Sequence, residues 1–188
     1  MDKWIIDTDR SVATFEVRLL FRRLRGKFTR ISGTALLDPD DITRSSVAAV
    51  IDAASAAADD AVWNTQLKGA HFLDAEHFPE ISFRSSSIEP LGGSRVRIFG
   101  ELTLHGTTCE EMLDAEYSGP VAERDWDYPG EERLSMGLSA TTAINREDYG
   151  IAFEAKEAGS LLLGKEILIT LDITLVSAFV PAGARIRT

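Results

Sequence analysis

A long two-stranded hairpin between Arg95 and Tyr117 is the feature that most constrains the fold of this chain. Along its first half, polar residues alternate with Val96, Ile98, Gly100, Leu102 and Leu104. A period of two places these five residues on one face of a strand, and Phe99 is the single apolar residue on the other face. The alternation stops at His105-Gly106, where glycine permits the positive φ of a tight turn, and a second strand begins at Thr107. The apolar face of this hairpin requires another layer to cover it.

Similar alternation elsewhere predicts that strands dominate the chain. The other predicted strands are 13–21, 27–37, 47–51, 81–85, 134–144 and 167–175. With the two strands of the hairpin, this makes about eight strands, most of them joined by short turns. Eight sequential antiparallel strands either close into an up-and-down barrel or form a two-sheet sandwich. A closed barrel of this size has room for packed side chains or for one small ligand.

One segment between the third and fourth predicted strands has helical periodicity instead. It begins after Asp59 or Asp60, either of which can serve as the N-cap, and places Trp63, Leu67 and Ala70 on one face. Pro79 follows closely and ends the pattern. Two further segments are predicted to be loop and tail. They are the acidic stretch 119–132, which contains Trp126 and Tyr128, and the residues from 177 to 188.

The charge balance argues against a nucleic-acid partner. The chain has 20 basic and 30 acidic residues and a formal net charge of −10, whereas phosphate binding relies on clustered lysine and arginine. The segment from Arg18 to Arg30 is a local exception, since its charged residues are all basic. It either contacts an anionic headgroup or pyrophosphate, or, as we favour, carries arginines on the solvent face of a strand or turn.

Three further features of the sequence bear on the cellular location of the protein. Cys109 is the single cysteine and has no partner for an internal disulfide. No run of 18 apolar residues predicts an integral membrane segment, and the first residues do not resemble a secretory signal. We therefore expect a cytoplasmic protein.

The sequence offers only weak evidence for catalytic or metal-binding residues. His71 and His77 are six residues apart, which is the wrong spacing for a zinc pair on one helical face. His105 and Cys109 are separated by the predicted turn, and we interpret His105 as a turn residue. No GxSxG, GxGxxG or Walker sequence is present. The sequence predicts no catalytic residue, no metal site and no cofactor.

The apolar residues are more informative than the polar ones. Several are expected to point into the barrel from neighbouring strands or to close one end from the helical insertion. The candidates for a ligand cavity are Phe15, Val17, Leu19, Trp63, Leu67, Phe72, Phe83, Leu102 and Leu104. Such positions are core by default, and the alternative is a cavity for an apolar ligand in which a few polar groups fix its orientation.

Four segments in order resemble the YceI-like family of lipid-binding proteins. Residues 100–108 (GELTLHGTT) are similar to its G-x-L-T-x-x-G-x-T signature, and residues 11–28 resemble its first strand. Residues 71–83 resemble a family stretch of the form D-F-x-x-x-x-x-P-x-x-x-F, in which Phe72, Pro79 and Phe83 match. Residues 144–151 (INREDYGI) resemble I-N-R-x-D-F-G-I. The similarity covers about residues 3–176.

The resemblance implies a lipocalin-like, eight-stranded antiparallel barrel that holds an isoprenoid or other lipid chain, with a homodimer as one expected state. Three polar positions of the family differ here. Arg10 replaces a histidine, a second histidine falls at Arg18 or Leu19, and residues 63–67 (WNTQL) replace R-D-x-H-L. The mouth of the cavity is therefore expected to be more apolar, through Trp63.

We therefore predict a single all-β domain over residues 1–188, with the barrel at about 3–176 and a tail at 177–188. It binds, sequesters or transports an amphiphilic or isoprenoid lipid without catalysis. The alternatives are an enzyme that acts on a hydrophobic substrate in the same cavity, and a filled-core module for interaction or stress response.

Overall fold

The computed structural model describes residues 1–19, 22–124, 132–151 and 163–177. Within these ranges, eleven strands form one antiparallel sheet. The strands are β1 (Asp2–Ile6), β2 (Val12–Leu19), β3 (Arg22–Phe28), β4 (Ile31–Leu37), β5 (Ser46–Asp52), β6 (Ala56–Ala58), β7 (Glu80–Gly92), β8 (Arg95–Leu104), β9 (Thr107–Arg124), β10 (Glu132–Asn145) and β11 (Leu163–Ser177). The helical elements are α1 (Ala61–Gln66) and the 3₁₀ turns η1 (Thr8–Arg10), η2 (Ile42–Arg44), η3 (Ala53–Ser55) and η4 (Arg146–Tyr149).

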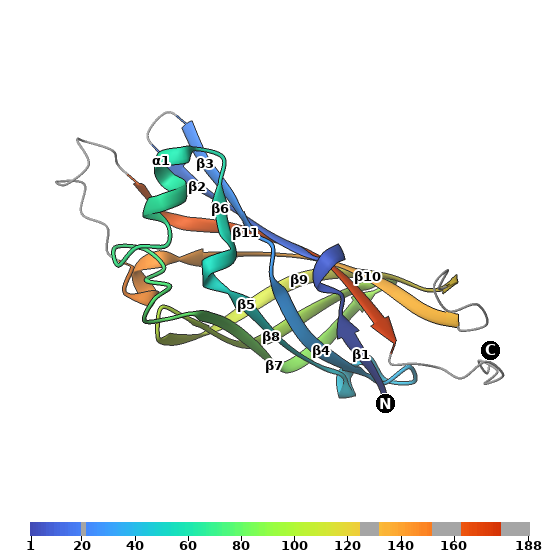
Figure 1. Cartoon of the computed structure of the whole chain (residues 1–188). Coiled ribbons are helices and arrows are strands. Elements are labelled where there is room, and N and C mark those ends of the chain that lie inside the picture. The colour runs from blue at the N-terminus through green and yellow to red at the C-terminus, as the bar shows by residue number, and fades with distance from the viewer. Residues whose placement is uncertain (20–21, 125–131, 152–162, 178–188) are drawn as a thin grey trace.

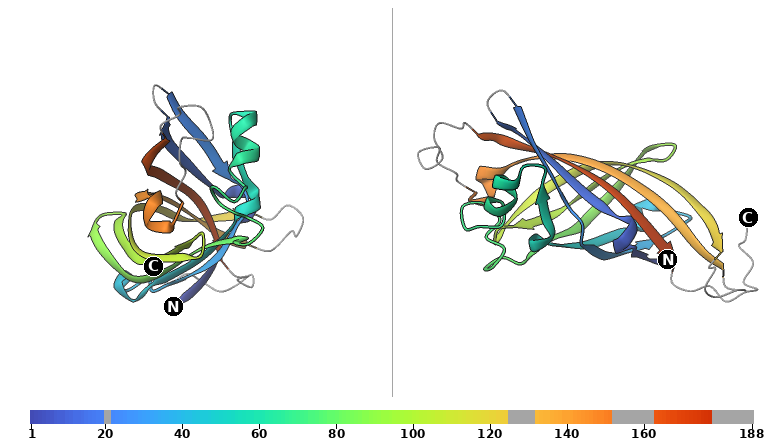
Figure 2. Two further views of the ribbon diagram at one scale, coloured as in Figure 1. Left: turned by 90° about the vertical axis from the view of Figure 1, so that its left-hand side faces the viewer. Right: turned by 45° about the horizontal axis from the view of Figure 1, so that its top comes forward.

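The sheet closes on itself as a barrel, because β1 pairs with β11 as well as with β4. The closed ring runs β1-β4-β5-β7-β8-β9-β10-β11, and β2, β3 and β6 continue the sheet beyond it. Figure 1 and Figure 2 show these three strands and α1 rising together at one end of the barrel. The predicted lipocalin-like, all-β antiparallel barrel is confirmed.

Three successive strands are broken at the same level of the wall. β1 and β2 are the two halves of one strand, separated by η1, and β3 and β4 are separated by residues 29–30. β5 and β6 are likewise separated by η3. When the halves are joined, the chain has eight long strands, and each of them contains one of the eight predicted segments. The prediction of one unbroken strand over 27–37 is wrong, because the pairing changes at Thr29-Arg30.

Hydrogen bonds hold the three breaks together across the sheet. The Thr8 hydroxyl donates to the carbonyl of Ile31 (2.7 Å), and the Arg30 N–H donates to the Ser55 hydroxyl (3.2 Å). On the other side, the Thr174 N–H donates to the Ser11 hydroxyl (3.0 Å), so that β11 remains continuous past the break. We call this band of polar contacts the seam. Above the seam, β6 pairs with β3 only, whereas below it β5 pairs with both β4 and β7.

Helix α1 is shorter than the periodicity predicts. Asp60 is its N-cap, and its carboxylate accepts the N–H groups of Val62 (2.9 Å) and Trp63 (3.4 Å). The helix stops at Gln66, and the following residues form turns, beginning with a bond from the Gly69 N–H to the Gln66 carbonyl (3.0 Å). Glycine lowers helix propensity, so the segment turns at Gly69 rather than continuing to Phe72. The turns span the space between β6 and β7.

The predicted hairpin that begins at Arg95 is formed by β8 and β9. Leu104 pairs with Thr107 in the ladder, and His105 and Gly106 have φ values of 51° and 74°. Positive φ at both central residues is the type I′ geometry that matches the twist of two strands. Val96, Ile98, Gly100 and Leu104 are buried on the inner face.

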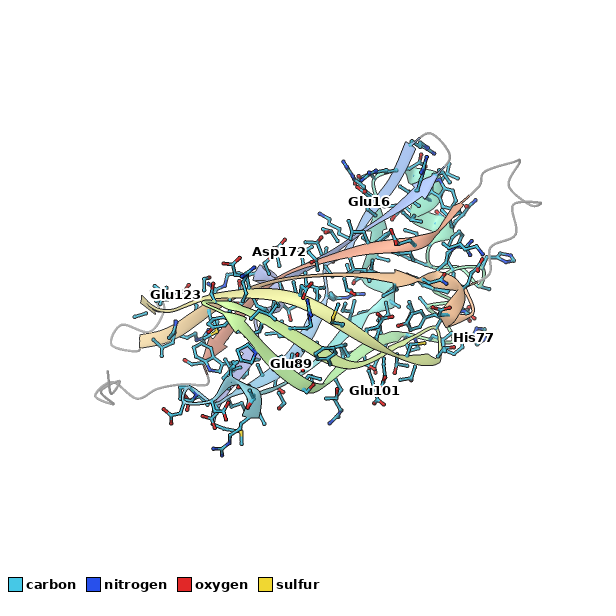
Figure 3. All side chains as sticks on the ribbon, turned by 180° about the vertical axis from the view of Figure 1, so that it is seen from behind. Glu16, His77, Glu89, Glu101, Glu123 and Asp172 are labelled. Carbon is cyan, nitrogen blue, oxygen red and sulfur yellow. The ribbon has the colours of Figure 1, made fainter. Side chains whose placement is uncertain are left out.

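Other predictions at the edges of the barrel need correction. Residues 119–124 of the predicted acidic loop belong to β9, because they pair with the start of β10. Trp126, Tyr128 and the tail from 178 onward lie outside the described residues. Strand β1 was not among the predicted strands. Charged side chains such as Glu16, Glu89, Glu101 and Asp172 lie on the outside of the wall (Figure 3).

The inward position of Gly100 generates a test of the packing. A methyl group on Gly100 would lie 2.4 Å from the Arg84 carbonyl oxygen and 2.6 Å from the Phe83 ring. We expect Gly100→Ala to lower the free energy of unfolding in urea by about 1–3 kcal/mol, because the backbone must shift. Gly69→Ala is the matched control, since its nearest contact would be 3.4 Å. It should change stability by less than about 0.5 kcal/mol. Equal effects of the two substitutions would contradict the packing described for Gly100.

Candidate functional site

The barrel encloses an apolar cavity of about 180 Å³. Side chains from the strands of the ring, from β2 and β3, and from the turns after α1 form its wall. Of the 33 residues that line it, only Ser82, Glu111, Thr142 and Arg146 are polar. A concave apolar space with few polar groups is the usual form of a site for a small apolar ligand.

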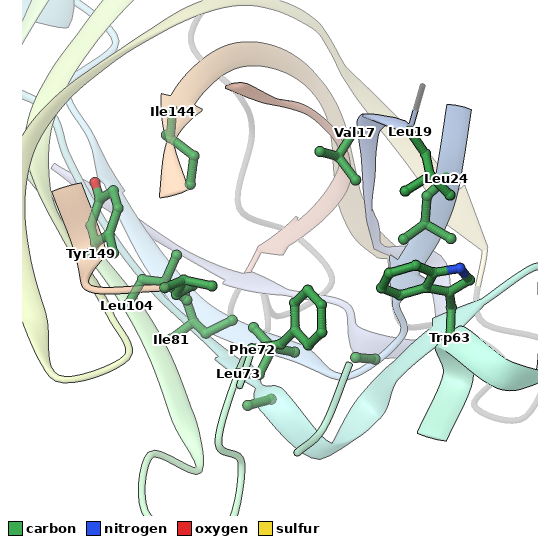
Figure 4. Close-up of a cluster of buried hydrophobic side chains, with 13 residues drawn as sticks. Val17, Leu19, Leu24, Trp63, Phe72, Leu73, Ile81, Leu104, Ile144 and Tyr149 are labelled. Atoms are coloured by element: carbon green, nitrogen blue, oxygen red, sulfur yellow. The ribbon is translucent and has the colours of Figure 1, made fainter. Parts of the chain in front are cut away.

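Seven of the nine residues proposed from the sequence lie in the cavity wall. These are Phe15, Val17, Leu67, Phe72, Phe83, Leu102 and Leu104. Leu19 and Trp63 do not line the cavity. They are 1% and 3% exposed in the buried cluster that also contains the wall residues Val17, Phe72 and Leu104 (Figure 4). Trp63 there packs edge-on against Phe72, with ring centroids 5.6 Å apart. Contact between a ligand and any of these nine side chains stays a prediction.

Most of the wall lies outside the nine predicted site residues, although the sequence carries a signal for part of it. The period-two run of β11 places Ile167, Ile169, Leu171, Ile173 and Leu175 in the cavity wall, as period two requires for one face of a strand. Ile98 of β8 also lines the cavity. By contrast, no local pattern identifies Leu73 or Ile151, which reach the cavity from turns.

Two glycines in the wall make room for aromatic rings. Gly26 is paired with Phe15 in the ladder, and a methyl group there would lie 2.3 Å from the Phe15 ring. Gly100 makes the corresponding contact with Phe83, on the adjacent strand. Because neither glycine has a side chain, each ring lies against the backbone of its neighbour. This position keeps both large side chains close to the wall.

A polar group of residues faces the cavity where the β8–β9 turn meets η4. Glu111 projects inward from β9, and its Oε1 accepts the hydroxyl of Tyr149 at 2.6 Å. The Tyr149 side chain is fully buried in the cluster of Figure 4. Burial, together with the bond to Glu111, raises the pKa of Tyr149 well above its ordinary value. The phenol therefore stays neutral and acts as a hydrogen-bond donor.

The turn residue His105 contributes to the same end of the barrel. Its Nδ1 lies 3.3 Å from the Tyr149 carbonyl oxygen, which makes Nδ1 the donor. Its ring packs on Phe78 with centroids 4.7 Å apart. Cys109 donates its thiol to the Asp148 carbonyl at 3.8 Å. His105 and Cys109 thus both contact η4 backbone and help to close this end of the barrel.

Arg146 is the buried cation of the site. It is 5% exposed, and its Nε donates to the Gly164 carbonyl at 3.0 Å while Nη1 donates to the Ile151 carbonyl. These bonds join η4 to the start of β11. Arg146 belongs to the motif at residues 144–151, but the sequence alone assigns no role to this residue.

His71 and His77, the histidines considered as metal ligands, are exposed on the surface. His77 is exposed, and its Nδ1 lies 2.9 Å from an Asp74 oxygen, an interaction that raises the pKa of His77. In the described ranges, no three histidine, cysteine or carboxylate side chains gather in a way that could hold a metal ion. No helix in these ranges is long and apolar enough to cross a membrane.

An antiparallel barrel closed around an apolar cavity defines a lipocalin-like class of β-barrel proteins. The sequence profile of the YceI-like domain matches residues 4–175, which is nearly the whole chain. The chain therefore belongs to the YceI-like family, and the resemblance seen in its motifs is confirmed. A UPF0312 protein from Vibrio cholerae is 30% identical over 151 residues, which cover 79% of this chain and 77% of the relative.

Two solved structures share the fold at low sequence identity. BcnA from Burkholderia cenocepacia superposes with a TM-score of 0.76 and 21% identity, over 90% of this chain and 98% of BcnA. A polyisoprenoid binding domain from Saccharophagus degradans superposes with a TM-score of 0.64 and 14% identity, over 95% of this chain and the whole of that domain.

The Tyr149–Glu111 bond generates a test with a pH dependence. We expect Tyr149→Phe to lower the free energy of unfolding at neutral pH by about 1–3 kcal/mol, because Glu111 loses its buried donor. Tyrosine ionises in the unfolded chain above about pH 10 but is held neutral in the fold, so the native protein loses stability as the pH rises further. Phenylalanine cannot ionise, and the difference between the two proteins should therefore shrink above pH 10.

Urea unfolding at neutral pH and at about pH 11 measures this change. Glu111→Gln is the control, because an amide oxygen can still accept the Tyr149 hydroxyl. A stability difference that is the same at both pH values would contradict the assignment of a neutral, buried Tyr149.

Proposed function

We propose that this protein binds an isoprenoid or another amphiphilic lipid chain in the barrel cavity, and that it sequesters or transports the chain without catalysis. The observation that carries the proposal is the cavity wall, which is apolar except for four residues. Burial in such a wall is favourable by about 0.8 kcal/mol for each CH₂ group. The polyisoprenoid binding domain of similar fold from Saccharophagus degradans supports this class of ligand.

The cavity is small. Pockets for drug-sized molecules have volumes of about 300–1,000 Å³, and the cavity here measures about 180 Å³. A flexible chain can adapt its conformation to a small space, whereas a rigid and bulky ring system cannot. This supports a linear lipid over a polycyclic one.

An enzyme is the second candidate, and the Glu111–Tyr149 pair is the observation in its favour. Paired polar groups inside an apolar cavity are a common arrangement for acid–base chemistry. The raised pKa of Tyr149 opposes this role, because a phenol that stays neutral is a poor base and a poor nucleophile. The existence of the cavity also argues against the third candidate, a filled-core interaction module. Cytoplasmic location and a homodimer stay predictions.

Native mass spectrometry of protein purified from its own host tests the proposal directly. We expect an added mass that organic extraction releases as a lipid. A protein that is empty, and that does not bind fluorescent fatty probes, would contradict the proposal. Conversion of a bound lipid into a new product would favour the enzyme.

A substitution in the wall tests the site. Leu102→Arg should abolish binding of a fluorescent fatty probe, because a charged group buried in an apolar space is costly. Met112→Arg is the matched control, since Met112 is 40% exposed on the outer face of the next strand and receives the same side chain. Phe83→Asp tests the adjacent strand in the same way, because Phe83 pairs with Leu102 in the β7–β8 ladder. Circular dichroism and urea unfolding identify variants that remain folded. Probe binding by folded Leu102→Arg would show that the inner wall does not contact the ligand.

A further inference from the structure

The β2–β3 hairpin concentrates the positive charge of an otherwise acidic chain. Residues 18–30 contain six of the 20 basic residues and none of the 30 acidic ones. The rest of the chain is therefore more acidic than the net charge of −10 suggests. Such asymmetry gives the molecule a preferred orientation in front of a negatively charged surface.

The structure places most of this charge on one outer face. Alternation along β2 and β3 turns Arg18, Arg23, Arg25 and Lys27 outward, and all four are exposed. We call these four residues the basic face. Within the described ranges, Glu16 is the acidic residue that pairs with this face, and it accepts both Arg23 and Arg25. Figure 3 shows Glu16 on the outside of the wall. Neither Arg18 nor Lys27 has an ion pair with a described residue.

The pairing register adds an unfavourable contact within the basic face. Arg18 lies directly opposite Arg23 in the β2–β3 ladder. Like charges in this position destabilise a sheet. Glu16 pairs with Arg23 and Arg25, and Asp59 adds a favourable charge interaction with Arg25, which leaves Arg18 and Lys27 without an ion pair to a described residue. A bound anionic surface would relieve this repulsion.

Exposed apolar side chains border the basic face. Leu168 of β11 is 45% exposed and lies opposite Glu16 in the ladder. Val62 is 65% exposed on α1, whose N-cap Asp60 pairs with Arg22 at 3.3 Å. Cations interspersed with exposed apolar groups suit the interfacial region of a bilayer, where both find partners. A nucleic acid would not use the apolar groups.

The other side of the same two strands forms part of the cavity wall. Val17 pairs with Leu24, one residue along from Arg18 and Arg23, and both side chains line the cavity. The basic face and the cavity are thus separated by the thickness of a single sheet. The basic face and this part of the cavity lie at the end of the barrel that carries α1 (Figure 1). At this end, β6 and β7 do not pair, and α1 and the turns after it connect them.

We propose that the basic face docks this end of the barrel onto an anionic membrane surface, where the lipid chain enters and leaves the cavity. The acidic remainder of the molecule then points away from the membrane. The inference rests on the proposed function, because it assigns the place at which that ligand is exchanged. Docking itself is measurable whether or not the cavity holds a chain.

Co-sedimentation with vesicles tests the docking. The full chain should bind phosphatidylglycerol vesicles at low salt, bind phosphatidylcholine vesicles much more weakly, and be released as the salt concentration rises. The double variant Arg18→Glu/Lys27→Glu reverses two charges without removing a described ion pair. We expect it to bind phosphatidylglycerol vesicles at least about 30-fold more weakly, since each basic residue near such a surface adds several-fold to binding.

The matched control is Lys3→Glu/Arg84→Glu, which makes the same change in net charge at exposed positions on β1 and β7. It should bind the vesicles nearly as well as the unchanged protein. Equal losses in the two double variants, or no binding by the unchanged protein, would overturn the proposal. Binding of a single-stranded DNA oligonucleotide as tightly as the anionic vesicles would also overturn it, because the face would then recognise phosphates in general.

A fluorescent fatty probe in vesicle-free solution separates this proposal from the proposed function. Both double variants should bind the probe like the unchanged protein, since neither alters the cavity wall. If no protein binds the probe, the proposed function fails while the vesicle result still decides the docking. If the probe binds but the vesicles do not, only the docking fails. Urea unfolding serves as the folding control, and Arg18→Glu should not lower stability because it faces Arg23.

Discussion

The seam of polar contacts across β1–β2, β3–β4 and β5–β6 controls the architecture of this barrel. A strand that breaks alone would leave buried N–H and C=O groups without partners, at a cost of about 1–3 kcal/mol each. Here three neighbouring strands break at one level, and the hydroxyls of Thr8, Ser11 and Ser55 satisfy backbone groups of the adjacent strands. Below this level the ring is closed by pairing, and above it β2, β3 and β6 separate from β7. The segment after α1 fills the separation, and Leu67 and Phe72 reach the cavity from it.

The cavity depends on how its walls accommodate large side chains. Protein interiors are normally packed without voids larger than a water molecule, so an open interior needs a structural cause. Glycines at positions 26 and 100 allow the Phe15 and Phe83 rings to lie against the wall. At the η4 end, Arg146 satisfies two backbone carbonyls and Tyr149 binds Glu111, so the polar groups there are occupied by the protein itself. The remaining surface is almost wholly apolar and suits an apolar chain.

The β2–β3 hairpin has one apolar face and one basic face, although its strands are only eight and seven residues long. The inner face contributes to the cavity wall, and the outer face carries arginines and a lysine. These cations lie on a solvent-exposed strand face, as predicted from the sequence. Their register places Arg18 opposite Arg23, and this like-charge contact supports the proposed membrane docking. Register of this kind depends on the pairing of strands and cannot be read from the charges alone.

The sequence by itself determined that strands dominate the chain, which face of the alternating strands is apolar, and the tight turn at His105-Gly106, because period two and positive φ at glycine are local properties. It also indicated seven of the cavity residues and, through four ordered motifs, the family. Tertiary structure decided where three strands break, since the hydroxyls that stabilise the breaks come from segments distant in sequence. It placed Leu19 and Trp63 in a packed cluster beside the cavity rather than in its wall. It also brought Glu111, Tyr149 and Arg146 to one end of the barrel. Local patterns show which face a side chain occupies, but only closure of the ring determines what lies opposite that face.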